Sequence, residues 1–239
     1  MTLARLPAAI AVFALLSTTA LAGGQKVVVE LFTSQGCSSC PPADRLLGEL
    51  AGDDSLVALS LPVDYWDYLG WHDTLAKAAY SQRQRGYSEQ RGSSEVFTPQ
   101  IIVNGVTQVV GSDRSAIKSA CTKAASKEKP VAVTLKKNAG KVEVEVSGGS
   151  GTPAAVWLLS VAQEKPVMIN RGENRGKTIT YHNVVREFRK LADWNGAPVK
   201  QSIALNEIGD DADMIAVLVQ PGSVEKPGPI RGAAALSLR

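Results

Sequence analysis

The sequence predicts an α/β fold for the first half of the chain and a mostly antiparallel, β-sandwich-like arrangement for the second half. As far as residue 127, apolar β-branched runs alternate with amphipathic segments in the order β-α-β-α-β-β-α. A polar segment ending in proline follows at 126–130, and short apolar runs separated by Gly, Pro and Asp clusters come after it. We therefore expect one domain over 25–127 and a β-rich domain over 131–239.

The first three elements form a predicted βαβ unit. Residues 26–33, KVVVELFT, are apolar and β-branched, which is typical of a buried strand. Residues 41–52, PPADRLLGELAG, place three leucines on one helical face and end at glycine. Residues 55–63, SLVALSLPV, form the second strand. A short helix between two such strands implies a parallel pair with a right-handed crossover.

The rest of the first half is predicted to contain a helix, a hairpin and another helix. The first helix is expected within 72–90 and the second within 112–127. Between them, residues 98–111 hold two short apolar runs joined around Asn104–Gly105, a strong signal for a tight hairpin. These elements complete the predicted order.

Beyond the polar segment the pattern changes to short strands. Alternating residues surround a turn at 138–140, which predicts a hairpin over 131–148. Further strands are expected at 154–162, 177–194, 199–205 and 214–220. Six or seven such strands without strong helical periodicity indicate an antiparallel sandwich.

The first residues predict the cellular location of the protein. Residues 1–22 combine one basic residue, a short apolar stretch and the tripeptide Ala-Leu-Ala, which is the layout of a signal peptide. We expect cleavage after Ala22 and export to the periplasm or medium, without stable membrane insertion of the mature chain. The 26 basic and 23 acidic residues are nearly balanced, and no basic run is interleaved with aromatics. A nucleic-acid partner is therefore not predicted.

The segment QGCSSCPPAD carries the chemistry that we predict. Of three cysteines, Cys37 and Cys40 are neighbours, so they are the expected pair, and Cys121 is expected to be a small buried apolar residue. The pair follows a strand and precedes a helix, where free backbone amides and the helix dipole stabilise a thiolate. We expect Cys37, the more exposed, to be the nucleophile and Cys40 to be the resolving thiol.

Other side chains are expected at the same sheet edge, because the carboxyl ends of parallel strands meet there. The stretch DYWDYLGW contains Tyr65 and Trp66, which are candidates for the wall of a groove that holds an extended substrate. The alternative is an aromatic loop packed against its own domain. Glu30 and Asp64 are candidate proton carriers for Cys40, unless each is only ion-paired or solvated.

Two alternatives use the same cysteines differently. Two thiols do not complete a zinc shell, so no metal or other cofactor is predicted. Soft Cu(I) accepts two thiolates, with His72 as a conceivable third ligand, which leaves a copper-binding or delivery protein open. A structural disulfide in a non-catalytic interaction module is the third possibility.

The order of elements, together with CSSC after the first strand, resembles the thioredoxin fold. The segment TPQ at 98–100 matches the cis-proline position of that superfamily. This resemblance implies that the Thr98–Pro99 bond is cis and that Pro99 faces Cys37 and helps to hold an extended substrate. VELFTSQGCSSCPPAD, VDYWDYLGW, VFTPQIIVNG and VGSDR are similar to a family of secreted bacterial proteins of unknown function with a thioredoxin-like domain.

These expectations favour an exported thiol–disulfide oxidoreductase. Cys37 would attack a disulfide and Cys40 would resolve the mixed disulfide, with protein or small-molecule thiols and disulfides as partners. The sequence does not distinguish an oxidase from a reductase or an isomerase.

Overall fold

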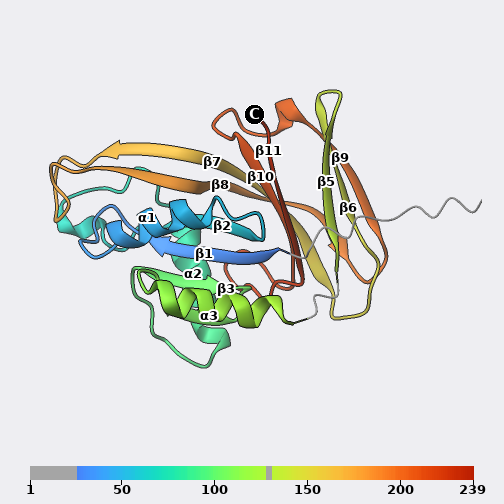
Figure 1. The fold of residues 1–239 in the computed structure, drawn as a ribbon, viewed down its shortest axis with the longest axis horizontal. Coiled ribbons are helices and arrows are strands. Elements are labelled where there is room, and N and C mark those ends of the chain that lie inside the picture. Colours follow the sequence, from blue (N-terminus) through green and yellow to red (C-terminus); the bar gives the residue numbers. More distant parts are fainter. Residues whose placement is uncertain (1–25, 128–130) are drawn as a thin grey trace, which may run out of the picture.

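The structure is a computed structural model that describes residues 26–127 and 131–239 (Figure 1). The predicted signal peptide, and residues 128–130 of the predicted boundary, lie outside the described residues. Within the described ranges, no helix has the length and apolar character needed to span a bilayer.

Three helices and eleven strands make up the described fold. The helices are α1 (Pro41–Leu50), α2 (Ala78–Gln90) and α3 (Arg114–Ala125), with 3-10 turns η1 (Asp67–Leu69) and η2 (Leu205–Glu207). The strands are β1 (Val27–Thr33), β2 (Leu56–Pro62), β3 (Gln100–Val103), β4 (Thr107–Val110), β5 (Val133–Asn138), β6 (Lys141–Val146), β7 (Ala154–Met168), β8 (Thr178–Trp194), β9 (Val199–Ala204), β10 (Met214–Gln220) and β11 (Gly232–Ser237).

A large mixed sheet has the strand order β11-β10-β7-β8-β2-β1-β3-β4. Strand β1 runs parallel to β2 and antiparallel to β3, which pairs with β4 in the expected hairpin. Asn104 and Gly105 in that turn have φ of 50° and 71°, the left-handed geometry that a tight hairpin turn requires. The first half therefore contains the predicted β-α-β-α-β-β-α order.

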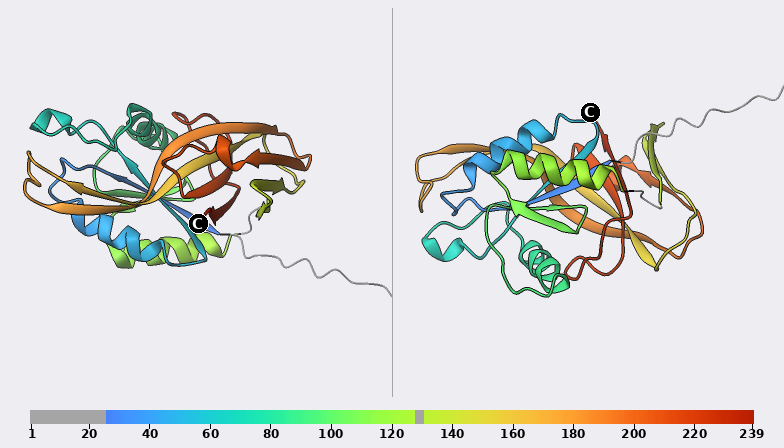
Figure 2. Two further views of the ribbon diagram at one scale, coloured as in Figure 1. Left: turned by 90° about the horizontal axis from the view of Figure 1, so that it is seen from above. Right: turned by 60° about the horizontal axis from the view of Figure 1, so that its bottom comes forward.

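Alternate residues of β1 face opposite layers, because side chains in a strand alternate between the two faces of the sheet. Val29 and Leu31 pack with Leu47 of α1 and Ile117 of α3. Val28 and Phe32 belong to a second cluster that includes Tyr80 and Tyr87 of α2. Helices α1 and α3 thus cover one face of this part of the sheet and α2 the other (Figure 2).

The second half contributes to both sheets. Strands β7, β8, β10 and β11 continue the large sheet, and β8 meets β2 in parallel at Val184 and Ser60. A separate antiparallel sheet, β5-β6-β9, packs over β7 and β10 around the fully buried Trp194. A sandwich-like layer is therefore present, joined to the first half by a shared sheet, and the division into two domains stays a prediction.

Three elements differ from the sequence-based expectation. Strand β7 extends to Met168, beyond the expected end at 162, and register shifts near Trp157 and Val161 interrupt its pairing with β8. Helix α2 begins at Ala78 rather than near 72, because Lys77 is extended and donates its N–H to the Pro62 carbonyl at the end of β2. The alanine-rich β11 lacks β-branched residues and was not predicted.

Candidate functional site

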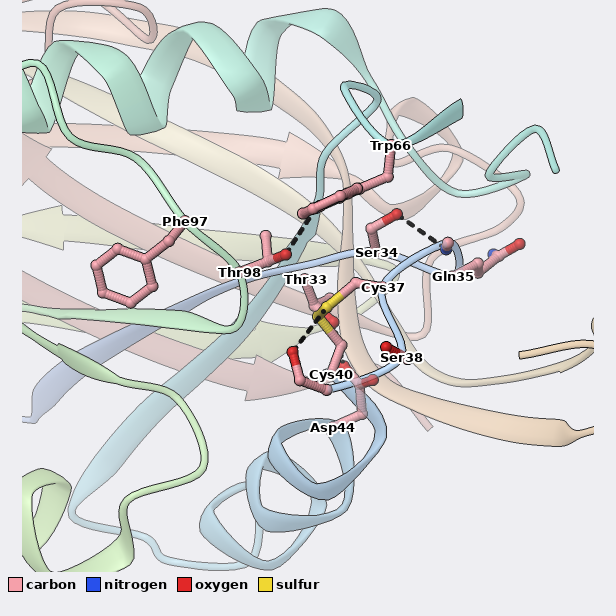
Figure 3. Close-up of a disulfide and its surroundings, with 12 residues drawn as sticks. Thr33, Ser34, Gln35, Cys37, Ser38, Cys40, Asp44, Trp66, Phe97 and Thr98 are labelled. Atoms are coloured by element: carbon pink, nitrogen blue, oxygen red, sulfur yellow. Dashed lines mark hydrogen bonds between the residues drawn. A yellow bond between two sulfur atoms is a disulfide. The ribbon is translucent and has the colours of Figure 1, made fainter. Parts of the chain in front are cut away.

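Cys37 and Cys40 form a disulfide between the end of β1 and the start of α1 (Figure 3). Their Cα atoms are 5.4 Å apart, Cys37 is 3% exposed and Cys40 is fully buried. Ser38 and Ser39 form an irregular turn, and the helix begins at Pro41 as expected. Cys37 is therefore the half of the disulfide nearer to solvent.

Few polar groups contact the sulfur atoms. The Ser39 hydroxyl lies 3.4 Å from the Cys37 Sγ, and the Cys40 N–H donates to the Cys37 carbonyl at 3.2 Å. Pro41 and Pro42 open the helix without N–H donors. The amides near a reduced Cys37 are thus chiefly those of the serine turn.

The structure brings Trp66 and Thr98 together beside the disulfide (Figure 3). The Trp66 indole N–H donates to the Thr98 hydroxyl at 2.7 Å, and the Thr98–Pro99 bond is cis. A Cβ atom on Gly36 would lie 3.1 Å from the Trp66 Cβ, so Trp66 approaches closely the residue before Cys37. Trp66 also stacks on Tyr68, whose ring is 77% exposed.

Tyr65 lies beside this group, with its ring centroid 5.9 Å from that of Trp66. Its hydroxyl donates to the Gln84 side chain of α2 at 3.1 Å. Burial raises the pKa of Tyr65 to about 12, so the phenol stays protonated and acts as a donor. A substrate-positioning role for Tyr65 stays a prediction, and its visible contact anchors the aromatic loop to α2.

The two predicted proton carriers lie on the α2 side of the sheet. Both Glu30 carboxylate oxygens are engaged, one by Arg83 at 2.8 Å and the other by the Tyr87 hydroxyl at 2.5 Å. Asp64 accepts a hydrogen bond from Ser81 of α2. Because Cys40 precedes α1 on the opposite face, the structure does not bring Glu30 or Asp64 to Cys40. Glu30 is ion-paired with Arg83, whereas the side-chain partner of Asp64 is a serine hydroxyl.

Asp44 is the carboxylate that does lie near Cys40. Its N–H donates to the Cys40 carbonyl at 3.1 Å, one helical turn away, and one carboxylate oxygen accepts the Thr33 hydroxyl at 2.7 Å (Figure 3). The other oxygen is buried without a partner among the described residues. Burial raises the pKa of Asp44 to about 8. The four-residue spacing after Cys40 was the signal for this site in the sequence.

The buried carboxylate of Asp73 is bound to the backbone just before the cysteine turn. Asp73 accepts the Gln35 N–H at 2.7 Å, and burial raises the pKa of Asp73 to about 6. Trp71 donates its indole N–H to the Gln35 side chain at 2.7 Å. The aromatic loop therefore fixes the residues that lead into Cys37.

The tip of the β7–β8 hairpin holds the turn from the other side. The Asn174 side-chain amide donates to the carbonyls of Gln35 and Cys37 at 2.9 and 2.8 Å. The Glu173 carboxylate accepts the Ser38 N–H at 3.1 Å. Sequence patterns do not predict these contacts, because they join residues more than 130 positions apart.

Cys121 and His72 lie away from the disulfide. Cys121 is half-buried, lines a groove between α1 and α3 and packs on their apolar cluster. Burial raises the pKa of Cys121 to about 11, which disfavours a reactive thiolate. His72 pairs with Asp67 at 2.5 Å. Across 26–127 and 131–239, no three His, Cys, Asp or Glu side chains are grouped to hold a metal.

Comparisons with known proteins assign this chain to a protein family. The chain is 33% identical to protein AGR_C_4864 from Agrobacterium tumefaciens, whose structure aligns with a TM-score of 0.79 over 90% of this chain and 96% of that chain. HBP35 of Porphyromonas gingivalis aligns at 16% identity with a TM-score of 0.62, over 90% of this chain and 76% of that one, which indicates a shared fold alone. The search of curated proteins gave no match. Residues 28–220 match DUF1223, described as a protein of unknown function, and the chain belongs to this family.

Proposed function

We propose that this chain is an exported thiol–disulfide exchange protein with a thioredoxin-like site. The observation that carries the proposal is the Cys37–Cys40 disulfide at a strand-to-helix junction, next to the cis Thr98–Pro99 bond. The strand order β2-β1-β3-β4 and the three flanking helices support the thioredoxin-like assignment. Export rests on the predicted signal peptide.

Cys37 is the sulfur that meets the substrate in this proposal. A substrate thiolate attacks the Cys37 sulfur, a new disulfide bond forms, and the Cys37–Cys40 bond breaks with Cys40 leaving as a thiolate. A second substrate thiolate then attacks the substrate sulfur of the mixed disulfide, releasing substrate disulfide and the Cys37 thiolate. The reverse sequence reduces a substrate disulfide.

Asp44 is the proposed proton carrier for Cys40. With a pKa of about 8, Asp44 is mostly protonated at neutral pH and can give its proton to the departing Cys40 thiolate. In the reverse direction the Asp44 carboxylate accepts the proton of the Cys40 thiol as that sulfur attacks the mixed disulfide. Asp44 takes the role that the sequence analysis gave to Glu30 and Asp64.

Trp66 and Thr98 are proposed to position an extended substrate. Their hydrogen bond fixes the indole beside Cys37, and the exposed Tyr68 extends the aromatic surface outward. A peptide next to a disulfide would stack on these rings while its backbone meets the segment at Pro99. Aromatic faces bury much apolar area at little cost in side-chain entropy.

A trapping experiment tests the proposal. In a Cys121→Ser background, the Cys40→Ser variant is incubated with oxidised glutathione and analysed by intact mass. We expect a stable adduct of one glutathionyl group on Cys37, because the resolving thiol is gone. The matched Cys37→Ser variant should form little adduct, since Cys40 is buried. Absence of an adduct on Cys40→Ser, or equal adducts on both variants, would contradict the proposal.

A further inference from the structure

The tip of the β7–β8 hairpin lies directly against the CxxC turn. Glu173 accepts the Ser38 N–H at 3.1 Å, one residue from Cys37, and the fully buried Asn174 donates to the Cys37 carbonyl at 2.8 Å. Figure 1 shows the tip and the start of α1 at the same end of the molecule. A carboxylate is thereby held next to the residue that carries the proposed nucleophile.

The local structure fixes this tip in place. Gly172 has φ of 74° and Gly176 has φ of 81°, which allow two tight bends within the loop. The Gly176 N–H donates to the Ile169 carbonyl at 2.8 Å, and Lys177 donates to the Asn174 side-chain oxygen at 2.9 Å. The Glu173 contact is therefore part of an ordered loop closed by several hydrogen bonds.

We propose that Glu173 is a positioning residue that restrains ionisation of the Cys37 thiol. The inference rests on the proposed exchange function, because it concerns the reactivity of the same sulfur. Glu173 acts in two ways: it engages the Ser38 N–H, and it places a negative charge near a sulfur that must become negative to react. The Cys37 thiol therefore forms less thiolate and is a weaker nucleophile than it would be without Glu173.

The other charged groups around the turn do not duplicate this role. Asp44 approaches from α1 and Asp73 from the aromatic loop, but burial raises their pKa values to about 8 and about 6. The same tip also carries the cations Arg171, Arg175 and Lys177, and Lys177 is bound to the Asn174 side chain. Unlike Asp44 and Asp73, Glu173 is exposed at the surface of the turn, and its carboxylate accepts the Ser38 N–H.

The test reads the ionisation of Cys37 directly. A Cys40→Ser, Cys121→Ser background leaves Cys37 as the single thiol, and its rate of alkylation by iodoacetamide is measured from pH 5 to pH 10. Exposed charges interact weakly in water, so Glu173→Gln should raise the rate at pH 7 on the order of threefold. The midpoint of the pH profile should fall by about 0.5 unit. Both changes should shrink in 1 M NaCl.

The matched control is Glu164→Gln, an identical change at an exposed position of the same hairpin. It should leave the alkylation profile unchanged. An unchanged profile for Glu173→Gln, an equal change in both variants, or a change that 1 M NaCl does not reduce would overturn the inference. Glutathione trapping on Cys40→Ser reports exchange itself, so a failed trap with a shifted Glu173→Gln profile rejects the proposed function separately.

Discussion

The substitution Asp44→Asn removes a buried carboxyl that the fold keeps protonated. The pKa of Asp44 is about 8 in the folded chain and ordinarily 3.8, because burial disfavours the anion. Between these values the folded protein holds a proton that the unfolded chain has released, so the stability from this group is complete below about pH 4 and is lost as pH rises to about 8. About 4 pH units at ~1.4 kcal/mol each give an upper limit of about 6 kcal/mol.

The assay is urea unfolding of the oxidised protein at pH 4, 6 and 8. We expect Asp44→Asn to match the wild-type free energy of unfolding near pH 4 and to exceed it by several kcal/mol at pH 8, since the amide needs no proton. The exposed Asp210→Asn serves as the control and should shift the free energy equally at all three pH values. A difference between Asp44→Asn and wild type that does not grow with pH would refute the reasoning.

Four further substitutions, one of them a control, test the packing and the substrate surface. Arg83→Ala leaves Glu30 buried without its ion-pair partner and should lower the free energy of urea unfolding by about 3–5 kcal/mol, whereas a loss below about 1 kcal/mol would argue against a desolvated pair. Gly86→Ala places a Cβ 2.1 Å from a backbone oxygen and should cost about 1–3 kcal/mol by thermal unfolding. Gly52→Ala, whose nearest atom is 3.5 Å away, should leave the Tm nearly unchanged, and equal losses in the two variants would contradict this account. Trp66→Phe removes the donor to the Thr98 hydroxyl and should raise the KM for a peptide disulfide several-fold at a stability cost of about 1 kcal/mol; an unchanged KM would exclude the indole from substrate binding.

Local patterns predicted most of the first half of the fold. The β-branched run before the cysteines, the leucines of α1 and the Asn104–Gly105 turn each determine a structure within a few residues of themselves. Helix α2 starts later than predicted because the Lys77 N–H is bound to the Pro62 carbonyl of β2, a contact between residues 15 positions apart. Strand β11 was missed because alanine carries little strand preference of its own.

The candidate site was predictable only where its residues are close in sequence. The cysteine pair and Pro99 follow from motifs, whereas the contacts of Glu173 and Asn174 depend on a hairpin that joins the sheet through β8. Glu30 was a candidate proton carrier because it is a carboxylate in an otherwise apolar strand. Side chains alternate between the two faces of β1, however, and this alternation directs Glu30 toward Arg83 of α2. Asp44 could have been found, because helical spacing places it one turn after Cys40.

Equilibration of the purified protein with glutathione redox buffers measures whether the Cys37–Cys40 disulfide exchanges with thiols. The oxidised and reduced forms, separated by thiol alkylation and intact mass, should interconvert reversibly as a two-electron couple. The account predicts a midpoint within the range of exchange-active CxxC proteins, about −270 to −120 mV. A Cys37–Cys40 disulfide that stays oxidised throughout, with a potential below about −300 mV, would identify a structural bond and contradict the account.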